Sequence, residues 1–226
     1  MQTFWNTNNG GNYALDNSMV LVDPNGKQVF VAFGGYGGMD AGKRISPDDY
    51  SREDRTGTEV LLNMISEYTE KNDLENAKIR GYFASPIGVE VDKAFEFIQS
   101  SLSSPSEPIV LYGYSLGGYN INKLADMLIS SGFKNDLILI TVDAYSPLFY
   151  LENNPGLEIS EDILINYNFY QETPSSIYSR GYPSKSKSDN VRNILIENTS
   201  HKGIDEQTNL RASGIIVSYI NRWRDK

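Results

Sequence analysis

Hydrophobic positions along this chain fall into two patterns, short continuous runs and runs with helical spacing. Continuous apolar runs at 109–111 and 137–142 are typical of strands that are buried on both faces of a sheet. Between them, apolar or small residues recur every three to four positions, as they do on one face of a helix. These positions are Gly117, Ile121, Leu124, Ala125 and Leu128. The pattern predicts a strand, a helix and a second strand.

The rest of the chain predicts the same alternation. Thr56 and Glu59 have the spacing of a capping box, which marks the start of a helix. In chain order, the further expected elements are a helix at 56–68, a strand at 78–84, a helix at 91–102, strands at 163–170 and 191–197, and a helix at 210–223. Strands that alternate with helices predict an α/β fold, with one mostly parallel sheet covered by helices on both faces.

The N-terminal part is expected to add an antiparallel hairpin. Apolar runs at 19–22 and 28–33 flank the sequence DPNG, which favours a turn. Polar or loop-like segments are expected at 1–17, 43–55, 145–162 and 171–190. The last two are rich in Pro, Ser and aromatic residues, which indicates surface loops or a small cap.

Length and composition favour one α/β domain. The chain has 226 residues, 39% of them hydrophobic, which is enough for one core but small for two full domains. The net charge of −9 and a pI near 4.7 disfavour nucleic acid and anionic membranes as partners. The chain has no cysteine, which excludes disulfides, thiolate zinc sites and a cysteine nucleophile. No signal peptide or bilayer-length apolar run is seen, so we expect no transmembrane segment and take the cytoplasm as the default compartment.

The segment IVLYGYSLGG at 109–118 has the layout of a nucleophile elbow. An apolar strand delivers Ser115 into a Gly-x-Ser-x-Gly frame, and a helix is expected to follow. Glycine at 113 and 117 removes side chains that would collide in so tight a turn. The backbone N–H of Leu116 would face an oxyanion at the helix N-terminus. The alternative is an ordinary strand–helix loop in which Ser115 is a helix N-cap.

A serine hydroxyl needs a base, and His201 is the one histidine of the chain. It follows the last expected strand, in a polar loop, so the chain order is serine, acid, histidine. Asp143 is the leading candidate for the acid, because it directly follows the buried strand 137–142. Glu172 is the alternative, since it follows the next expected strand. Weaker candidates are Asp162 and Asp189.

A tetrahedral oxyanion needs a second N–H donor besides that of Leu116. The sequence FGGYGG follows the strand expected at 28–33, and it places glycine-rich backbone near the same edge of the sheet. Gly35 or Tyr36 is therefore the expected second donor. The alternative is a flexible turn without a catalytic role.

Taken together, these segments resemble the α/β-hydrolase superfamily, and in particular its compact lipase and esterase branch. The matching segments are FGGY at 33–36, GYSLGG at 113–118, TVD at 141–143, and SH at 200–201 followed by ID at 204–205. The string NYNFYQ at 166–171 is also similar to a segment that precedes the histidine in some bacterial lipase-like proteins. Two features depart from the family. Its first strands are shortened here to a hairpin, and its usual His-Gly pair is Phe33-Gly34.

The resemblance implies a serine hydrolase with Ser115 as nucleophile, His201 as base and Asp143 as acid. We expect it to cleave carboxylic esters of small-molecule acyl substrates through an acyl-enzyme, with no cofactor and no metal. Peptidase, thioesterase and acyltransferase chemistry use the same residues and stay open. Neither the substrate nor the oligomeric state follows from the sequence.

Two readings compete with an enzyme of this class. Gly37, Gly42 and Lys43 nearly spell a phosphate-binding loop, but Arg44 stands where that loop needs Ser or Thr. A non-catalytic binding module on a hydrolase scaffold is the stronger rival, because fold and function are separable. The aromatic residues that would line an acyl pocket, or else belong to the core, are Tyr145, Phe149, Tyr150, Tyr167, Phe169 and Tyr170.

Overall fold

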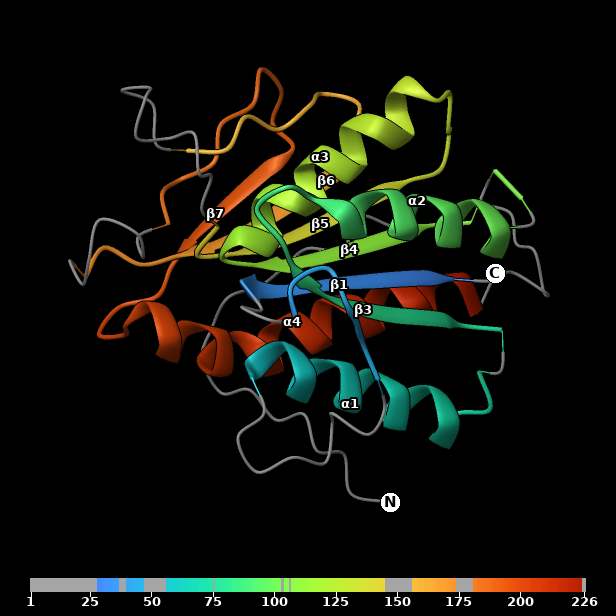
Figure 1. Ribbon diagram of the computed structural model, residues 1–226, viewed down its shortest axis with the longest axis horizontal. Coiled ribbons are helices and arrows are strands. Elements are labelled where there is room, and N and C mark those ends of the chain that lie inside the picture. The colour runs from blue at the N-terminus through green and yellow to red at the C-terminus, as the bar shows by residue number, and fades with distance from the viewer. Residues whose placement is uncertain are drawn as a thin grey trace.

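The described part of the chain has a seven-stranded sheet at its centre in the computed structural model (Figure 1). The residues that the structure describes are 28–36, 40–46, 56–74, 76–102, 104–105, 107–144, 156–173 and 181–224. The strands are β1 (Val29–Tyr36), β2 (Arg44–Ile45), β3 (Lys78–Ala84), β4 (Ile109–Tyr114), β5 (Leu137–Val142), β6 (Ile165–Tyr170) and β7 (Val191–Leu195). Their order across the sheet is β2-β3-β1-β4-β5-β6-β7. All neighbouring strands are parallel except the β2–β3 pair.

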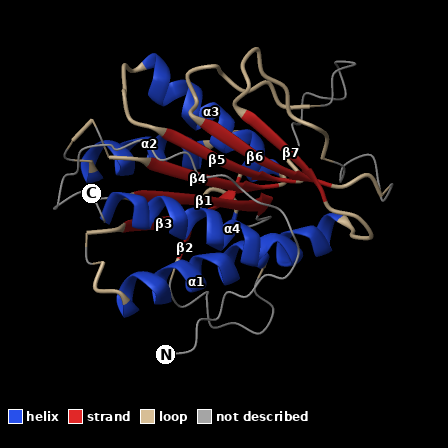
Figure 2. Ribbon diagram, turned by 180° about the vertical axis from the view of Figure 1, so that it is seen from behind, coloured by secondary structure: helices blue, strands red, loops and turns tan. Residues whose placement is uncertain are grey.

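Among the described residues, four helices cover the two faces of this sheet. They are α1 (Gly57–Lys71), α2 (Val89–Ser101), α3 (Leu116–Ser130) and α4 (His201–Arg224). Helices α2 and α3 lie on one face, and α1 and α4 lie on the other, as the two opposite views show (Figures 1 and 2). The predicted α/β architecture is confirmed. No helix among the described residues has both the length and the hydrophobicity to cross a membrane.

Successive side chains of a strand point to opposite faces of the sheet, and each face has its own hydrophobic core. In β4, Ile109 and Leu111 pack with α2 and α3, whereas Val110 and Tyr112 pack with α1 and α4. All four side chains are at most 1% exposed. A strand covered on both faces must be apolar at successive positions, which explains the continuous run in the sequence. The sheet therefore holds the end of β4 rigidly from both sides.

The antiparallel part of the sheet comes from β2, in a segment that we expected to be a solvated loop. Arg44 pairs with Tyr82 and Ile45 with Gly81. Ile45 is 1% exposed, and it packs over Gly81, which has no side chain to obstruct it. A strand of two residues is too short to show a period, so its sequence gave no signal. The strand expected at 19–22 and its turn lie outside the described residues.

Helix α4 corrects a second expectation. It begins at His201 rather than at residue 210, so His201 is the first residue of a helix and not part of a loop. The added turns bury polar side chains, among them Asp205, Thr208 and Asn209. Polar residues on the inner face mask the apolar spacing from which a helix is recognised. The candidate base, His201, is thus attached to a long, packed helix.

Candidate active site

Ser115 occupies the tight turn between β4 and α3. Its backbone has φ 56° and ψ −123°, which is a strained conformation for a residue with a side chain. A Cβ on Gly113 would collide with the backbone of Gly117, and one on Gly117 would collide with the carbonyl groups of Phe33 and Gly34. The predicted strand–turn–helix elbow is confirmed. Ser115 stands at the N-cap position, but its side chain makes no capping hydrogen bond.

The hydroxyl of Ser115 instead faces His201. Ser115 Oγ lies 2.9 Å from His201 Nε2, and His201 Nδ1 lies 2.6 Å from Asp143 Oδ2. A carboxylate only accepts, so the neutral imidazole donates from Nδ1 and leaves Nε2 to accept the serine proton. The three side chains come from the ends of β4 and β5 and from the start of α4. They form a hydrogen-bonded chain with the order and geometry that a Ser-His-Asp triad requires.

Asp143 is held from several directions at the end of β5. Its side chain is fully buried, and its φ of 44° turns the chain sharply after the strand. The backbone N–H of Gly181 donates to Oδ1 over 2.6 Å, and Gln171 Nε2 donates to Oδ2 over 3.2 Å. With His201, these groups satisfy both carboxylate oxygens. The carboxylate is therefore fixed in place and its negative charge is compensated by N–H donors.

Gln171 and Gly181 had no role in the sequence analysis. Gln171 is the last residue of the string NYNFYQ, and the resemblance of that string to bacterial lipase-like proteins assigns no role to this side chain. Gly181 lies so close to Asp143 that a Cβ would collide with the aspartate side chain and backbone. No local pattern links either residue to Asp143, from which they are 28 and 38 positions distant. Only the folded sheet brings them together.

None of the other candidate acids, all of them among the described residues, forms a hydrogen bond with the imidazole of His201. Glu172 is exposed and has no hydrogen bond to the imidazole, although it is next to Gln171. Asp162 and Asp189 are also exposed. They precede β6 and β7, at the opposite edge of the sheet from Ser115. Among the four candidate acids, the structure pairs His201 with Asp143.

The expected oxyanion donors lie around Ser115. Leu116 is the first residue of α3, so its N–H is one of the helix's unpaired donors. A Cβ on Gly35 would stand 3.7 Å from Ser115 Cβ, so this backbone passes directly beside the serine. The pairing of β1 with β3 is irregular between Phe33 and Tyr36, as often happens at bulges near active sites. The role of Leu116, Gly35 and Tyr36 as donors stays a prediction.

The phosphate-loop interpretation does not fit the observed backbone. Lys43 forms an ion pair of 2.8 Å with Asp40, and Arg44 belongs to β2. A phosphate loop requires a helix directly after it, and α1 begins only at Gly57. Among the described residues, no group of three or more His, Asp or Glu side chains could hold a metal ion.

The aromatic residues proposed for an acyl pocket fall into three groups, and one of these is Tyr170 alone, which is half-buried at the end of β6. Phe169 is 1% exposed and Tyr167 packs beside it, both in the core shared with α4. These two residues are therefore part of the core. Tyr145, Phe149 and Tyr150 lie outside the described residues.

The sheet, the elbow after β4 and the order Ser115, Asp143, His201 together define the fold. It is an α/β-hydrolase fold. The strand order and the elbow both agree with the resemblance seen in the sequence.

Comparisons with known proteins add structural neighbours at low identity. No protein-family model matches the chain, and no curated protein matches it. ClbQ from the colibactin NRPS/PKS pathway is similar at 10% identity, with a TM-score of 0.46 over 87% of this chain and 98% of ClbQ. The type II thioesterase BorB of the borrelidin cluster has 9% identity and a TM-score of 0.45, and the match covers 89% of this chain and 99% of BorB. RedJ, a thioesterase of Streptomyces coelicolor, has 10% identity and a TM-score of 0.41, and the match covers 88% of this chain and 90% of RedJ.

Proposed function

We propose that this protein is a serine hydrolase that cleaves a carboxylic ester through an acyl-enzyme at Ser115. One observation carries the proposal. An unbroken chain of hydrogen bonds runs from Ser115 Oγ through His201 to Asp143, with lengths of 2.9 and 2.6 Å. A strained backbone at Ser115 supports it, because such strain costs on the order of 1–3 kcal/mol and is concentrated at functional sites.

In the first half-reaction, Ser115 Oγ attacks the ester carbonyl carbon. His201 Nε2 takes the serine proton, and the buried carboxylate of Asp143 stabilises the imidazolium that forms. The negative carbonyl oxygen would face the N–H groups of Leu116 and of Gly35 or Tyr36. When the C–O bond to the leaving group breaks, Nε2 returns the proton to the departing alcohol. The acyl group is then esterified to Ser115.

In the second half-reaction, a water molecule replaces the alcohol. His201 Nε2 removes one proton from this water, and the resulting hydroxide attacks the acyl-enzyme carbonyl carbon. The tetrahedral intermediate collapses, the bond to Ser115 Oγ breaks, and Nε2 returns the proton to the serine. A carboxylic acid leaves. No cofactor enters either step.

Hydrolysis of a panel of p-nitrophenyl esters with graded acyl chains tests this proposal. We expect saturable turnover, a rapid initial burst of p-nitrophenol where deacylation is the slower step, and no turnover by Ser115→Ala. Glu172→Gln is a matched control, because it also changes a polar side chain at this edge of the sheet but removes no hydrogen bond to the imidazole of His201.

The same panel includes acyl thioesters and peptides with equal acyl groups. Turnover confined to thioesters or to peptides would overturn the ester assignment while keeping Ser115 as nucleophile. A folded protein that is inactive on all three classes would contradict the enzyme itself and favour the binding module.

A further inference from the structure

Strand β4 carries two tyrosines that both reach the start of α4. Tyr112 and Tyr114 are two positions apart in β4, so their side chains leave the same face of the sheet. That face is the one covered by α1 and α4. The strand that ends in the candidate nucleophile therefore contacts the helix that begins with the candidate base.

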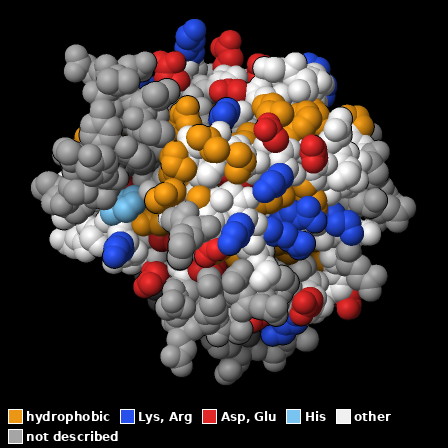
Figure 3. Space-filling view, in the orientation of Figure 1, with side chains coloured by type: hydrophobic (Ala, Val, Ile, Leu, Met, Phe, Trp, Pro, Cys, Tyr) orange, Lys and Arg blue, Asp and Glu red, His pale blue; other side chains and the backbone are white. Residues whose placement is uncertain are grey.

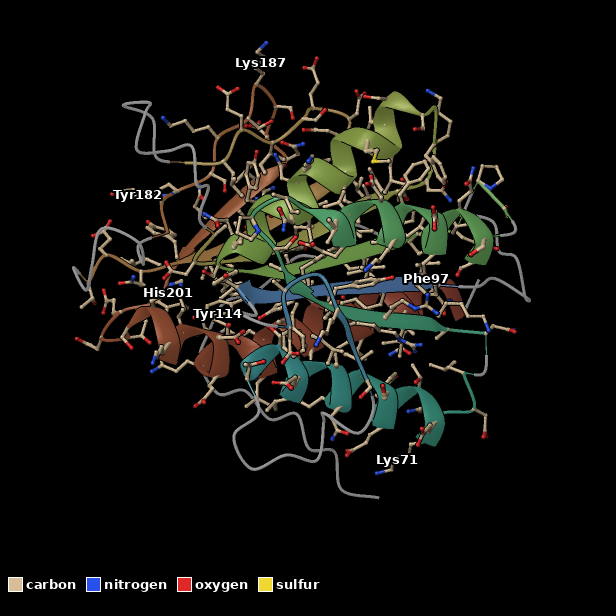
Figure 4. All side chains as sticks on the ribbon, viewed as in Figure 1. Lys71, Phe97, Tyr114, Tyr182, Lys187 and His201 are labelled. Atoms are coloured by element: carbon tan, nitrogen blue, oxygen red, sulfur yellow. The ribbon has the colours of Figure 1, made fainter. Side chains whose placement is uncertain are left out.

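Tyr114 contacts His201 in two ways. The phenol ring stacks on the imidazole, with the ring centroids 5.1 Å apart and the planes inclined by 28°. Its hydroxyl donates a hydrogen bond of 2.7 Å to the backbone carbonyl of His201. Figure 4 shows the two labelled side chains next to each other at the same end of the sheet. Both the ring and the backbone of His201 are thus fixed by the residue that precedes Ser115.

Tyr112 makes the second connection, one helical turn further along α4. Its hydroxyl donates a hydrogen bond of 2.6 Å to Asp205 Oδ1. Asp205 Oδ2 accepts the backbone N–H of Thr58 over 3.0 Å, in the first turn of α1. Asp205 is 2% exposed. Gly57 packs so closely against it that a Cβ at position 57 would collide with the Asp205 carboxylate. This carboxylate joins the first turns of α1 and α4 to β4.

Both tyrosines remain hydrogen-bond donors at any working pH. Burial raises the pKa of the Tyr112 and Tyr114 hydroxyls above the ordinary value of 10, and the negative charge of Asp205 raises both further. A protonated phenol can donate to a carbonyl or carboxylate without interruption. The two connections therefore do not depend on titration of either tyrosine.

Position matters here because Ser115 and His201 are 86 residues apart in sequence. The chain between β7 and α4, residues 196–200, is mostly exposed and buries only Thr199. Such a segment is a weak constraint on where the helix begins. Proton transfer, in contrast, requires a donor–acceptor distance near 3 Å, and a displacement of about 1 Å can reduce the rate about 100-fold.

We infer that Tyr114 and Tyr112 are positioning residues, which hold the imidazole of His201 at proton-transfer distance from Ser115 by fixing the first two turns of α4 to the nucleophile strand. Tyr114 acts on the imidazole directly, and Tyr112 acts through Asp205. This inference rests on the proposed function for its kinetic consequence, but the position of the imidazole can be measured without turnover.

The kinetic test compares hydroxyl deletions at the two ends of α4. Tyr114→Phe keeps the stack and loses the hydrogen bond, and Tyr114→Leu loses both. Tyr68→Phe is the matched control, because the Tyr68 hydroxyl donates over 2.7 Å to Asn221 near the other end of α4. We expect kcat to fall about 10-fold in Tyr114→Phe and about 100-fold in Tyr114→Leu with KM nearly unchanged. Tyr112→Phe should lower kcat less than Tyr114→Phe does, and Tyr68→Phe should leave kcat unchanged.

Nitrogen-15 NMR of the imidazole gives the second readout, and it is simple because the chain has one histidine. In the wild type we expect one neutral tautomer with the proton on Nδ1 and a far-downfield Nδ1–H resonance from the bond to Asp143. Tyr114→Leu should weaken that resonance or mix the tautomers, and Tyr68→Phe should not. Should Tyr114→Leu fail to fold, Tyr114→Phe decides the comparison.

The two readouts separate the two proposals. A wild type without turnover whose imidazole spectrum still changes in the Tyr114 variants would contradict the proposed function and support the positioning role. An active wild type whose Tyr114 and Tyr112 variants match Tyr68→Phe in both kcat and spectrum would overturn the positioning role. A fall in kcat with an altered spectrum, confined to the Tyr112 and Tyr114 variants, supports both.

Discussion

Asp143 Oδ2 lies 2.6 Å from His201 Nδ1, although the two residues are 58 positions apart in sequence. The carboxylate is fully buried and is satisfied by N–H groups of Gly181, Gln171 and His201. The carboxylate of Asp143 is therefore shielded from bulk water. In a serine-hydrolase triad, a carboxylate in this position fixes the imidazole tautomer and compensates the charge that the ring acquires during proton transfer.

Replacement of Asp143 by Asn should lower kcat strongly. An amide can present an NH₂ group to Nδ1 and so favour the wrong tautomer, which costs about 10⁴-fold in a serine-hydrolase triad. Glu172→Gln, at an exposed position, should stay within about twofold of the wild type. Steady-state ester hydrolysis by the two purified variants measures both effects. Equal losses, or a larger loss in the Glu172 variant, would show that Asp143 is not the acid.

Two glycine-to-alanine changes should have opposite effects on stability. A Cβ at Gly117 would meet the backbone carbonyl groups of Phe33 and Gly34, so Gly117→Ala should destabilise the fold by about 1–3 kcal/mol. Gly214 lies within α4 with nothing within 4 Å of its added Cβ. Gly214→Ala should therefore stabilise by about 0.5–1 kcal/mol. Urea unfolding at one pH gives both values, and effects of the same sign would disprove the assigned packing.

The stability of the protein should depend on the titration of Asp205. Burial raises the pKa of this carboxyl from 3.8 to about 6, aided by the charge of Glu206 and opposed by Tyr112, the Thr58 N–H and His201. Between pH 3.8 and about pH 6, the folded state therefore keeps a proton on Asp205 that the unfolded chain has already released. The contribution of Asp205 to the free energy of unfolding is full below pH 3.8 and is lost as pH rises through 6.

Urea unfolding from pH 4 to pH 7 measures this contribution. The stability of the wild type relative to Asp205→Asn should fall by on the order of 1–3 kcal/mol across this range, because Asn does not titrate. Parallel curves for the two proteins would mean that the pKa of Asp205 is the same in the folded and unfolded states.

Local features of the sequence were enough to predict the elbow and its serine. The two glycines, the apolar run before Ser115 and the helical spacing after it all lie within one short segment. Asp143 was favoured because it ends a buried strand, which is also a local property. These predictions depend on neighbours in sequence, and the structure bears out the elements that they require.

Features that depend on distant contacts could not be predicted in the same way. Gln171, Gly181 and Tyr114 have partners that only the completed sheet supplies. The start of α4 was missed because its first turns bury Asp205 and other polar groups instead of a regular apolar face. The sequence placed His201 after the last strand, but the distance from its ring to Ser115 is set by tertiary packing.

The most direct measurement of the central claim, that His201 activates Ser115 as a nucleophile, is covalent labelling with a fluorophosphonate followed by peptide mass mapping. We predict one adduct per chain, located on Ser115, no adduct in Ser115→Ala, and labelling at least about 100-fold slower in His201→Gln. A folded wild-type protein that remains unlabelled, or one that carries its adduct at another residue, would contradict the account.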